Sequence, residues 1–458
     1  MLAASPARLT RRIVPALLVV FYGCSDPSAP TAPRIESRAH ALAAPMVTVL
    51  NTDDAGAGSL RQAILDAAAG SVIQFDAAIA GQAIVLSTGQ IVIDKLLTIE
   101  GPIPLGMTIS GGMSSRVFNV FPDGNVVFRN VSIVNGNEQT VGGGGGGLWV
   151  NGTVLLDHVL VANNQTGNTG GAIFVKSSGQ LTLINTTVSG NSGGLGGGIA
   201  SGGSVTIWNS TIVNNTSTQA GGVWVPEGSL YLRNSIIANN TDSEGATAYD
   251  NCQVGPNTAV RYAGANLSND DSCGSAPNVM VADPNLGPLG DHGGPTKTHA
   301  LNIMSPGIDL GNACTEATDQ RYVTRNQGAS CDVGAFEFND FGTVSLAIGP
   351  NASVNAKTGI ITLTGTISCS KPGVSRLGVT VSQTQKTTGK FSTIIQGYGE
   401  TSLLSCDTRT ASWSAIVNPT SSGKLDKGTA SVAVSTISLP PGFLAANASA
   451  TVKVFVAK

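Results

Sequence analysis

The sequence predicts an all-β protein built around a right-handed parallel β-helix, with a separate β-domain after it. Five 12-residue segments align without gaps, and their starts are 28, 27, 24 and 25 residues apart. A Gly-rich segment precedes each of the last four. The segments start at Val126, Val154, Leu181, Val205 and Leu230. The composition agrees, since 58 Gly, 12% charged and 41% hydrophobic residues favour strands joined by tight turns over disorder.

The apolar positions of the repeat explain why the coils must stack. Positions one, three and eight are apolar in every segment, as in Val126, Phe128 and Ile133. Alternation along a strand places positions one and three on one face, which we expect to point inward. One coil cannot bury its own core, whereas a stack can. A β-propeller would need a longer unit of about 40 residues, and a calcium-binding roll would need Asp after the glycines.

Position five of the repeat is polar and predicts a ladder. The residues are Asn130, His158, Asn185, Asn209 and Asn234. Coils stack about 4.8 Å apart, so equivalent side chains can hydrogen-bond to one another along the stack. The Asn pairs that end the segments, such as Asn163-Asn164 and Asn214-Asn215, are typical of turn residues in left-handed conformations.

A short helix is predicted ahead of the repeats. Ser59 and Gln62 have the spacing of a capping box, and the segment runs through Ala69. Leu60, Ile64 and Ala68 share one face. We expect this helix to cover the open N-terminal end of the stack, with early coils between residues 91 and 109.

The N-terminus has the features of a lipoprotein-type signal peptide over residues 1–24. Three arginines precede a short apolar run that ends at Gly23-Cys24. We expect lipidation of Cys24, with ordinary cleavage and no lipid as the alternative. Residues 25–45 are rich in Pro, Ser and Ala and predict a flexible tether. This predicts a location in the cell envelope, at the outer-membrane surface, or outside the cell, with the lipid as the membrane contact.

The net charge limits the classes of binding partner, and the cysteines indicate the redox compartment. The formal charge is −3, and loss of the three leader arginines makes it −6, which disfavours nucleic acid as a partner. Six cysteines follow the repeats and predict three local disulfides in an oxidising compartment, rather than a zinc site. The pairs are Cys252 with Cys273, Cys314 with Cys331, and Cys369 with Cys406. We expect a monomer without a cofactor, calcium remaining an open alternative.

Several motifs between residues 46 and 338 resemble one bacterial family. Residues 48–64 include Asn51-Thr52 and Gly58-Ser-Leu-Arg-Gln-Ala-Ile64, and residues 283–296 read DPNLGPLGDHGGPT. Ser305-Pro-Gly-Ile-Asp-Leu-Gly311 and Cys331-Asp-Val-Gly-Ala-Phe-Glu337 follow in order. These motifs resemble the choice-of-anchor Q family, and the repeats are more weakly similar to those of polymorphic outer-membrane proteins. The resemblance implies a pectin-lyase-like β-helix in a surface or secreted protein with no agreed enzymatic activity.

The composition changes near residue 344, where alternating Thr, Val, Ser and Ile begin. Runs such as ITLTGTIS after Ile360 and TASVAVSTI from Thr429 predict short strands. Residues 344–458 therefore predict a separate β-sandwich of immunoglobulin-like type.

Catalytic chemistry is sparse in the repeats. Glycoside hydrolases need paired carboxylates, and polysaccharide lyases need a base with a charge neutraliser. The acids between residues 126 and 241 are Glu138, Asp157 and Glu227, and they share no row. Arg129 and Asp157 are expected to form an ion pair across one rung.

Polar residues gather after the last repeat and admit two interpretations. They include Asp283, His299, Asp332 and Glu337, and the catalytic candidates Asp291, His292, Asp309, Asp319 and Arg321. Such a set can hold a metal or perform acid–base chemistry. Asp beside Gly and Pro also caps turns, and Asp with Arg forms structural ion pairs. We favour a structural cap that closes the stack, with His292 as the first residue to test.

An outward aromatic row gives the clearest hint of binding. The strands with Leu148, Ile173, Ile199 and Val223 inward have Trp149, Phe174, Ala200 and Trp224 outward. Trp208 occupies a second outward row, at position four. Exposed aromatic side chains stack on sugar rings or anchor a protein partner, unless a loop or the C-terminal domain covers them. The prediction is an adhesin-like surface protein, with a polysaccharide lyase or hydrolase as the alternative.

Overall fold

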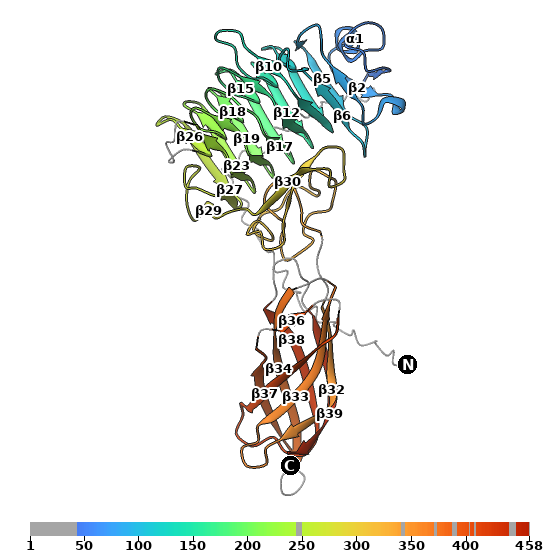
Figure 1. The fold of residues 1–458 in the computed structure, drawn as a ribbon, viewed down its shortest axis with the longest axis vertical. Helices are drawn as coiled ribbons and strands as arrows, with labels where there is room; N and C mark the ends of the chain where they lie inside the picture. Colours follow the sequence, from blue (N-terminus) through green and yellow to red (C-terminus); the bar gives the residue numbers. More distant parts are fainter. Residues whose placement is uncertain are drawn as a thin grey trace, which may run out of the picture. The chain divides into compact units, whose positions relative to one another are not determined.

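A computed structural model describes residues 44–243, 250–339, 344–370, 373–386, 392–402, 404–406, 409–438 and 446–457. The predicted signal peptide, Cys24 and residues 25–43 of the predicted tether lie outside this set. The regular structure of the described chain is almost entirely β-strand (Figure 1).

The first part of the chain is a parallel β-solenoid with three long sheets, here called A, B and C (Figure 1). From β2 to β26 each coil passes from sheet A to sheet B to sheet C. Sheet A contains β1 (Met46–Val49), β2 (Ser71–Phe75), β5 (Leu96–Glu100), β8 (Asn125–Arg129), β12 (Thr153–Asp157), β16 (Gln180–Ile184), β19 (Ser204–Trp208), β23 (Ser229–Arg233) and β27 (Ala259–Ala263). Sheet B contains β3 (Ala83–Val85), β6 (Met107–Ser110), β9 (Val131–Val134), β13 (Leu160–Ala162), β17 (Thr187–Ser189), β20 (Thr211–Val213), β24 (Ile236–Ala238), β28 (Asn266–Ser268) and β29 (Val279–Val281). Sheet C contains β4 (Ile91–Ile93), β7 (Phe118–Val120), β11 (Leu148–Val150), β15 (Ile173–Val175), β18 (Ile199–Ser201), β22 (Val223–Val225) and β26 (Cys252–Val254).

The register of sheet A confirms the gapless alignment of the repeats. Val154 pairs with Val126 on one side and with Leu181 on the other, and Val205 pairs with Leu230. Short strand pairs, β10 (Asn137–Glu138) with β14 (Gln165–Thr166) and β21 (Thr216–Ser217) with β25 (Thr241–Asp242), extend the pairing between sheets B and C. The inward apolar side chains of all three sheets form one continuous core.

The turns follow the prediction, but the hydrogen-bonded ladder lies elsewhere. All five position-five residues have positive φ, as do Asn163 and Asn214 at the second corner. The position-five side chains do not bond to one another within the described part of the chain. The side chain that follows the second corner is instead buried, and each Nδ2 donates to the next Oδ1 at 2.8–3.0 Å. This row is Asn164, Asn191, Asn215, Asn240 and Asn251.

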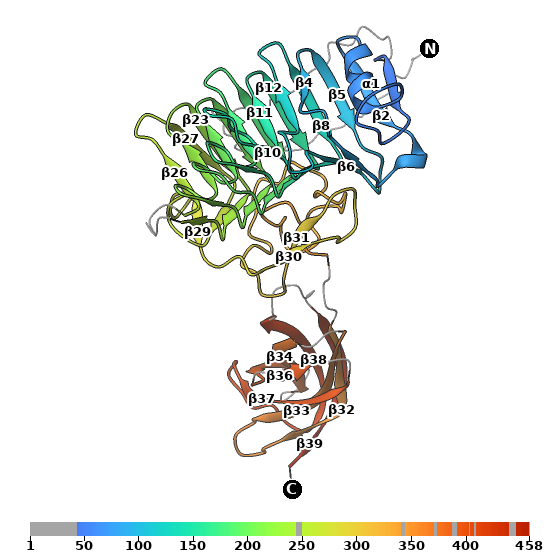
Figure 2. The ribbon, with the colours of Figure 1, turned by 45° about the horizontal axis from the view of Figure 1, so that its top comes forward.

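The predicted helix is present but shorter than expected. Helix α1 spans Leu60–Asp66 and lies beside β2 (Figure 2). The backbone N–H of Gln62 donates to the Ser59 side chain at 3.2 Å, and Leu60 and Ile64 join the core. Ala67 is already extended, so Ala68 lies outside the helix and is exposed rather than on the buried face.

A segment that follows the coils folds back along the stack. We call residues 283–339 the returning segment; it contains the antiparallel pair β30 (Leu286–Gly290) and β31 (Thr298–Leu301). Thr187 donates to Gln320 at 2.7 Å, Ser189 contacts His299 at 2.9 Å, and Ala335 N donates to Thr211 at 2.9 Å. Figures 1 and 2 show β30 beside the stack. The predicted closing cap therefore covers the outer face of sheet B rather than the end of the last coil.

The C-terminal strands form a closed barrel, so the predicted sandwich is wrong. The strands are β32 (Val344–Val354), β33 (Ile361–Cys369), β34 (Gly373–Lys386), β35 (Ser392–Glu400), β37 (Ala411–Pro419), β38 (Gly428–Ser438) and β39 (Asn447–Val456), and β36 (Leu404–Cys406) pairs with β34 alone. Their order is β35-β37-β33-β32-β39-β38-β34, and β34 pairs with β35 to close the ring. Alternating strands suit a barrel and a sandwich equally, because both have one buried face. Gly365 allows close packing in this core, since a Cβ there would lie 2.3 Å from the Trp413 ring.

Candidate functional site

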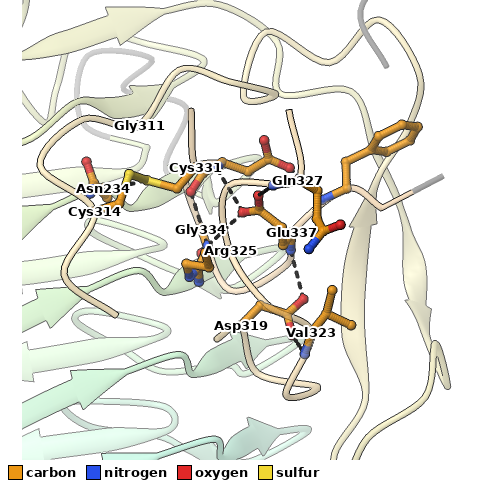
Figure 3. Close-up of polar contacts among 12 residues, drawn as sticks. Asn234, Gly311, Cys314, Asp319, Val323, Arg325, Gln327, Cys331, Gly334 and Glu337 are labelled. Atoms are coloured by element: carbon orange, nitrogen blue, oxygen red, sulfur yellow. Dashed lines mark hydrogen bonds and ion pairs between the residues drawn. A yellow bond between two sulfur atoms is a disulfide. The ribbon is translucent and has the colours of Figure 1, made fainter. Parts of the chain in front are cut away.

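The polar residues of the returning segment form a buried ionic network (Figure 3). Arg325 donates to Asn185 Oδ1 at 2.8 Å and to Gly334 O at 2.9 Å, and lies 3.4 Å from the Glu337 carboxylate. Asp319 accepts hydrogen bonds from Arg321, Val323 N and Glu337 N. The network ties the segment to itself and to one corner of the solenoid.

Burial shifts the ionisation of this network. Burial, together with the neighbouring Glu337 carboxylate, raises the pKa of Asp332 to about 8. Burial also raises the pKa of Glu337 and lowers the pKa of Arg325. Asp319, Asp332 and Glu337 are each at most 1% exposed. A substrate in solution has no access to carboxylates so deeply buried, and their partners show a structural role.

The five catalytic candidates lie in three different settings. Asp319 and Arg321 pair with each other at 2.6 Å inside the network, as the ion-pair interpretation predicted. Asp309 accepts a hydrogen bond from Ser330 N at 3.0 Å. Asp291 and His292 are exposed, and the His292 ring packs edge-on against Phe336 at 5.8 Å.

A polar corner that sequence reasoning missed lies where the position-five row meets the returning segment. The Tyr322 ring stacks on His158 at 4.2 Å, and its hydroxyl donates to Asn130 Oδ1 at 2.7 Å. Asp157 contacts His158 Nδ1 at 2.5 Å and forms the predicted ion pair with Arg129 at 2.9 Å. No local pattern joins residues so far apart in the chain. The only sign of this site in the sequence is the polar residue at position five of each repeat, in a corner expected to be left-handed.

Glu316 is an acidic residue of this corner whose carboxylate has no directly bonded partner among the described residues. Burial, and then the charge of Asp157, raise its pKa. Arg325, Arg233 and His158 act on it in the opposite direction. Within the described residues its carboxylate makes no hydrogen bond.

The outward aromatic row of sheet C is present as predicted. Trp149 pairs in register with Phe174, and Ala200 pairs with Trp224. The three aromatic side chains are half-buried, while Ala200 is buried. Trp149 meets Phe174 edge-on at 4.9 Å, and the cations of Arg116 and Lys176 lie 5.1 and 5.5 Å from its ring. The row therefore offers apolar ring surface beside positive charge.

Trp208 does not belong to an accessible surface. Its side chain is only 4% exposed, although it occupies the outward row at position four. Its ring meets Tyr231 edge-on at 5.9 Å and lies 5.7 Å from the Arg233 guanidinium. Neighbouring side chains thus cover it, and its prediction as a ligand-binding residue is wrong.

A groove of about 450 Å³ lies between sheet B and the returning segment. Its floor is the outer face of β6, β9 and β13, where Thr108, Ser132 and Leu160 pair in register. Its lining includes Leu105 from the loop before β6 and Asp291 from the returning segment. Asp291 is the one predicted catalytic candidate among the residues that line this groove.

The remaining predictions concern disulfides, metals and membranes. Cys252–Cys273 and Cys314–Cys331 are bonded as predicted. Cys369 is disulfide-bonded, and the Cys406 side chain lies outside the described residues. In the part of the chain that the structure describes, no three His, Cys, Asp or Glu side chains are grouped as metal ligands. None of the described helices has the length and apolar character needed to cross a membrane.

No protein-family profile matches the chain, and no curated protein matches it. We therefore infer function from the residues and their geometry.

Proposed function

We propose that this chain is an exported surface protein whose solenoid binds a glycan or a surface protein. The observation on which this depends is the row of Trp149, Phe174 and Trp224 on sheet C. Half-exposed rings on one rigid face are a common means of holding a sugar or anchoring a partner. Lys176, whose ammonium lies 5.5 Å from the Trp149 ring, adds a hydrogen-bond donor to that face.

The location and anchoring are part of the same proposal. The leader supports export, and two disulfides in the solenoid and returning segment are compatible with an oxidising compartment. We propose a lipid on Cys24, an outer-membrane or extracellular location, and a monomer. We also propose that the chain belongs to the choice-of-anchor Q family and that α1 covers the end of the stack. We propose a right-handed coil, because crossovers between parallel strands are almost always right-handed.

A polysaccharide lyase or hydrolase is the rival function. It would need acids or bases that converge on an open surface. Asp319, Asp332 and Glu337 are instead buried and bonded within the returning segment, and Asp291 is the one acid among the residues that line the groove. This arrangement supports binding over bond cleavage.

The variant carrying both Trp149→Ala and Trp224→Ala tests the proposed surface. We expect its affinity for glycans or host-surface preparations that retain the wild-type chain to fall by about tenfold or more. Tyr398→Ala is the control, because Tyr398 is 41% exposed on the barrel and outside the row. Unchanged binding of the double variant to every such preparation would remove the aromatic row from the proposal.

A further inference from the structure

The outer face of sheet B is covered over some coils and open over others. The returning segment packs an apolar cluster, including Leu301, Val333 and Phe336, against Val213 and Ile236. Over the earlier strands β6, β9 and β13 the same face is the floor of the groove. Thr108, Ser132 and Leu160 of this floor belong to one outward row, which continues under the returning segment to Ile236.

The loop before β6 and the returning segment approach each other closely at Gly106 and Pro295. Gly106 has a φ of +62°, and a Cβ there would lie 2.1 Å from the Pro295 carbonyl oxygen. Only glycine allows this approach of the loop before β6 to the returning segment. A close backbone contact therefore joins the two walls beside the lining residues Leu105 and Pro295.

Four of the polar side chains that line the groove are free to bind a ligand. The side chains of Thr108, Ser132, Asn163 and Lys297 line it and make no hydrogen bond within the described residues. They supply hydroxyl, amide and ammonium groups, which include both donors and acceptors. Leu105, 60% exposed, provides apolar surface beside them. A small number of convergent polar groups among apolar ones is the usual composition of a ligand site.

The charges of the lining and the pairing of the floor strands indicate which class of ligand the groove can bind. Asp291 and Lys297 are the charged residues of the lining, so the groove has no net charge to attract a polyanion. The backbone of the floor strands is paired with neighbouring coils on both sides, so a peptide cannot add to it as a further strand. An uncharged molecule rich in hydroxyl groups fits both conditions.

We infer that this groove binds a short, uncharged oligosaccharide, independently of the aromatic row on sheet C. The inference rests on the proposed binding function and assigns it a second site. Sugar hydroxyls would replace water at Ser132, Thr108, Asn163 and Lys297, and a ring face would lie against Leu105. The volume, about 450 Å³, lies within the usual range of roughly 300–1,000 Å³ for ligand pockets.

The test uses the purified full chain on an array of neutral glucan, xylan, mannan and galactan oligosaccharides, with oligogalacturonate as the charged comparator. Leu105→Ala and Lys297→Ala each remove one wall contact, and Ser132→Trp fills the floor from its outward face. Leu65→Ala is the matched control, because Leu65 is 63% exposed on α1 and outside the groove. Thermal unfolding identifies any variant that fails to fold. If Ser132→Trp fails to fold, the two alanine variants still test the groove.

We expect the groove variants to lose about tenfold or more of the affinity for a neutral oligosaccharide that Leu65→Ala and the Trp149/Trp224 variant still bind. If the groove variants bind like the wild type while the Trp variant loses binding, the inference is overturned and the proposed function stands. Binding of oligogalacturonate in place of neutral sugars overturns the ligand class. An array on which the wild type binds nothing overturns the groove as a glycan site.

Discussion

Glu316 illustrates what single residues contribute at the corner between solenoid and returning segment. Its carboxylate is partly buried near Asp157, and both effects raise its pKa above 4.5. An acid with a raised pKa in the folded state binds its proton more tightly there than in the unfolded chain. Its contribution to stability is complete below about pH 4.5 and is lost as the pH rises through the folded-state pKa.

Replacement of Glu316 by Gln should therefore stabilise the protein at high pH. We expect the two proteins to have similar free energies of unfolding near pH 4, and the variant to be more stable by about 0.5–1 kcal/mol near pH 8, a value reduced for partial solvent exposure. Denaturant unfolding across this pH range measures the difference. Glu227→Gln, at an exposed glutamate, controls for the loss of one charge. A variant less stable than the wild type at pH 8 would show that the carboxylate is needed in its ionised form.

Residue-level prediction succeeded where one strand or one local pair decides the outcome. The inward positions of the repeats, the Arg129–Asp157 ion pair and two disulfides followed from alternation and spacing. Burial of Trp208 did not, because it depends on side chains of the next coil. The contact of Thr187 with Gln320 joins residues 133 positions apart, and no local signal predicts it.

At the scale of elements, the Asn ladder is the clearest device that unites the coils. Asn164, Asn191 and Asn215 are each at most 1% exposed, and each side chain also donates to a backbone carbonyl. The preceding residue at this corner is left-handed in most coils, which reverses the alternation of the strand and turns the second Asn inward. The Asn pairs at the ends of the repeats contain this ladder in the sequence. The position-five row is more regular in sequence, and the ladder was therefore predicted there instead.

Asn191→Ala should be strongly destabilising. It removes the Nδ2 donor to Asn215 Oδ1 and to Val161 O, and the Oδ1 acceptor of Asn164. Several buried polar groups lose their partners, so we expect a loss of about 3–5 kcal/mol in the free energy of unfolding. Asn168→Ala, whose side chain makes one exposed bond to Thr140 O, should cost below about 1 kcal/mol. Equal effects of the two substitutions would contradict the ladder's structural role.

For the whole molecule, the sequence predicts a solenoid and a later β-domain but not how either is completed. The repeats establish the stacking, because each coil buries its neighbour's apolar side chains. The returning segment covers sheet B through contacts between distant parts of the chain, and it leaves β6, β9 and β13 open as the groove floor. Closure of the barrel depends on one further pairing, β34 with β35, which strand patterns alone do not reveal.

At the scale of the whole molecule, we expect the protein to bind a polysaccharide without cleaving it. The most direct measurement incubates the purified chain with a panel of polysaccharides, with and without calcium, and follows polymer retention and the release of reducing or unsaturated ends in the same samples. We expect at least one polymer to be retained by the protein at its original length. Release of short fragments, with calcium or without it, would contradict the account and establish the lyase or hydrolase in its place.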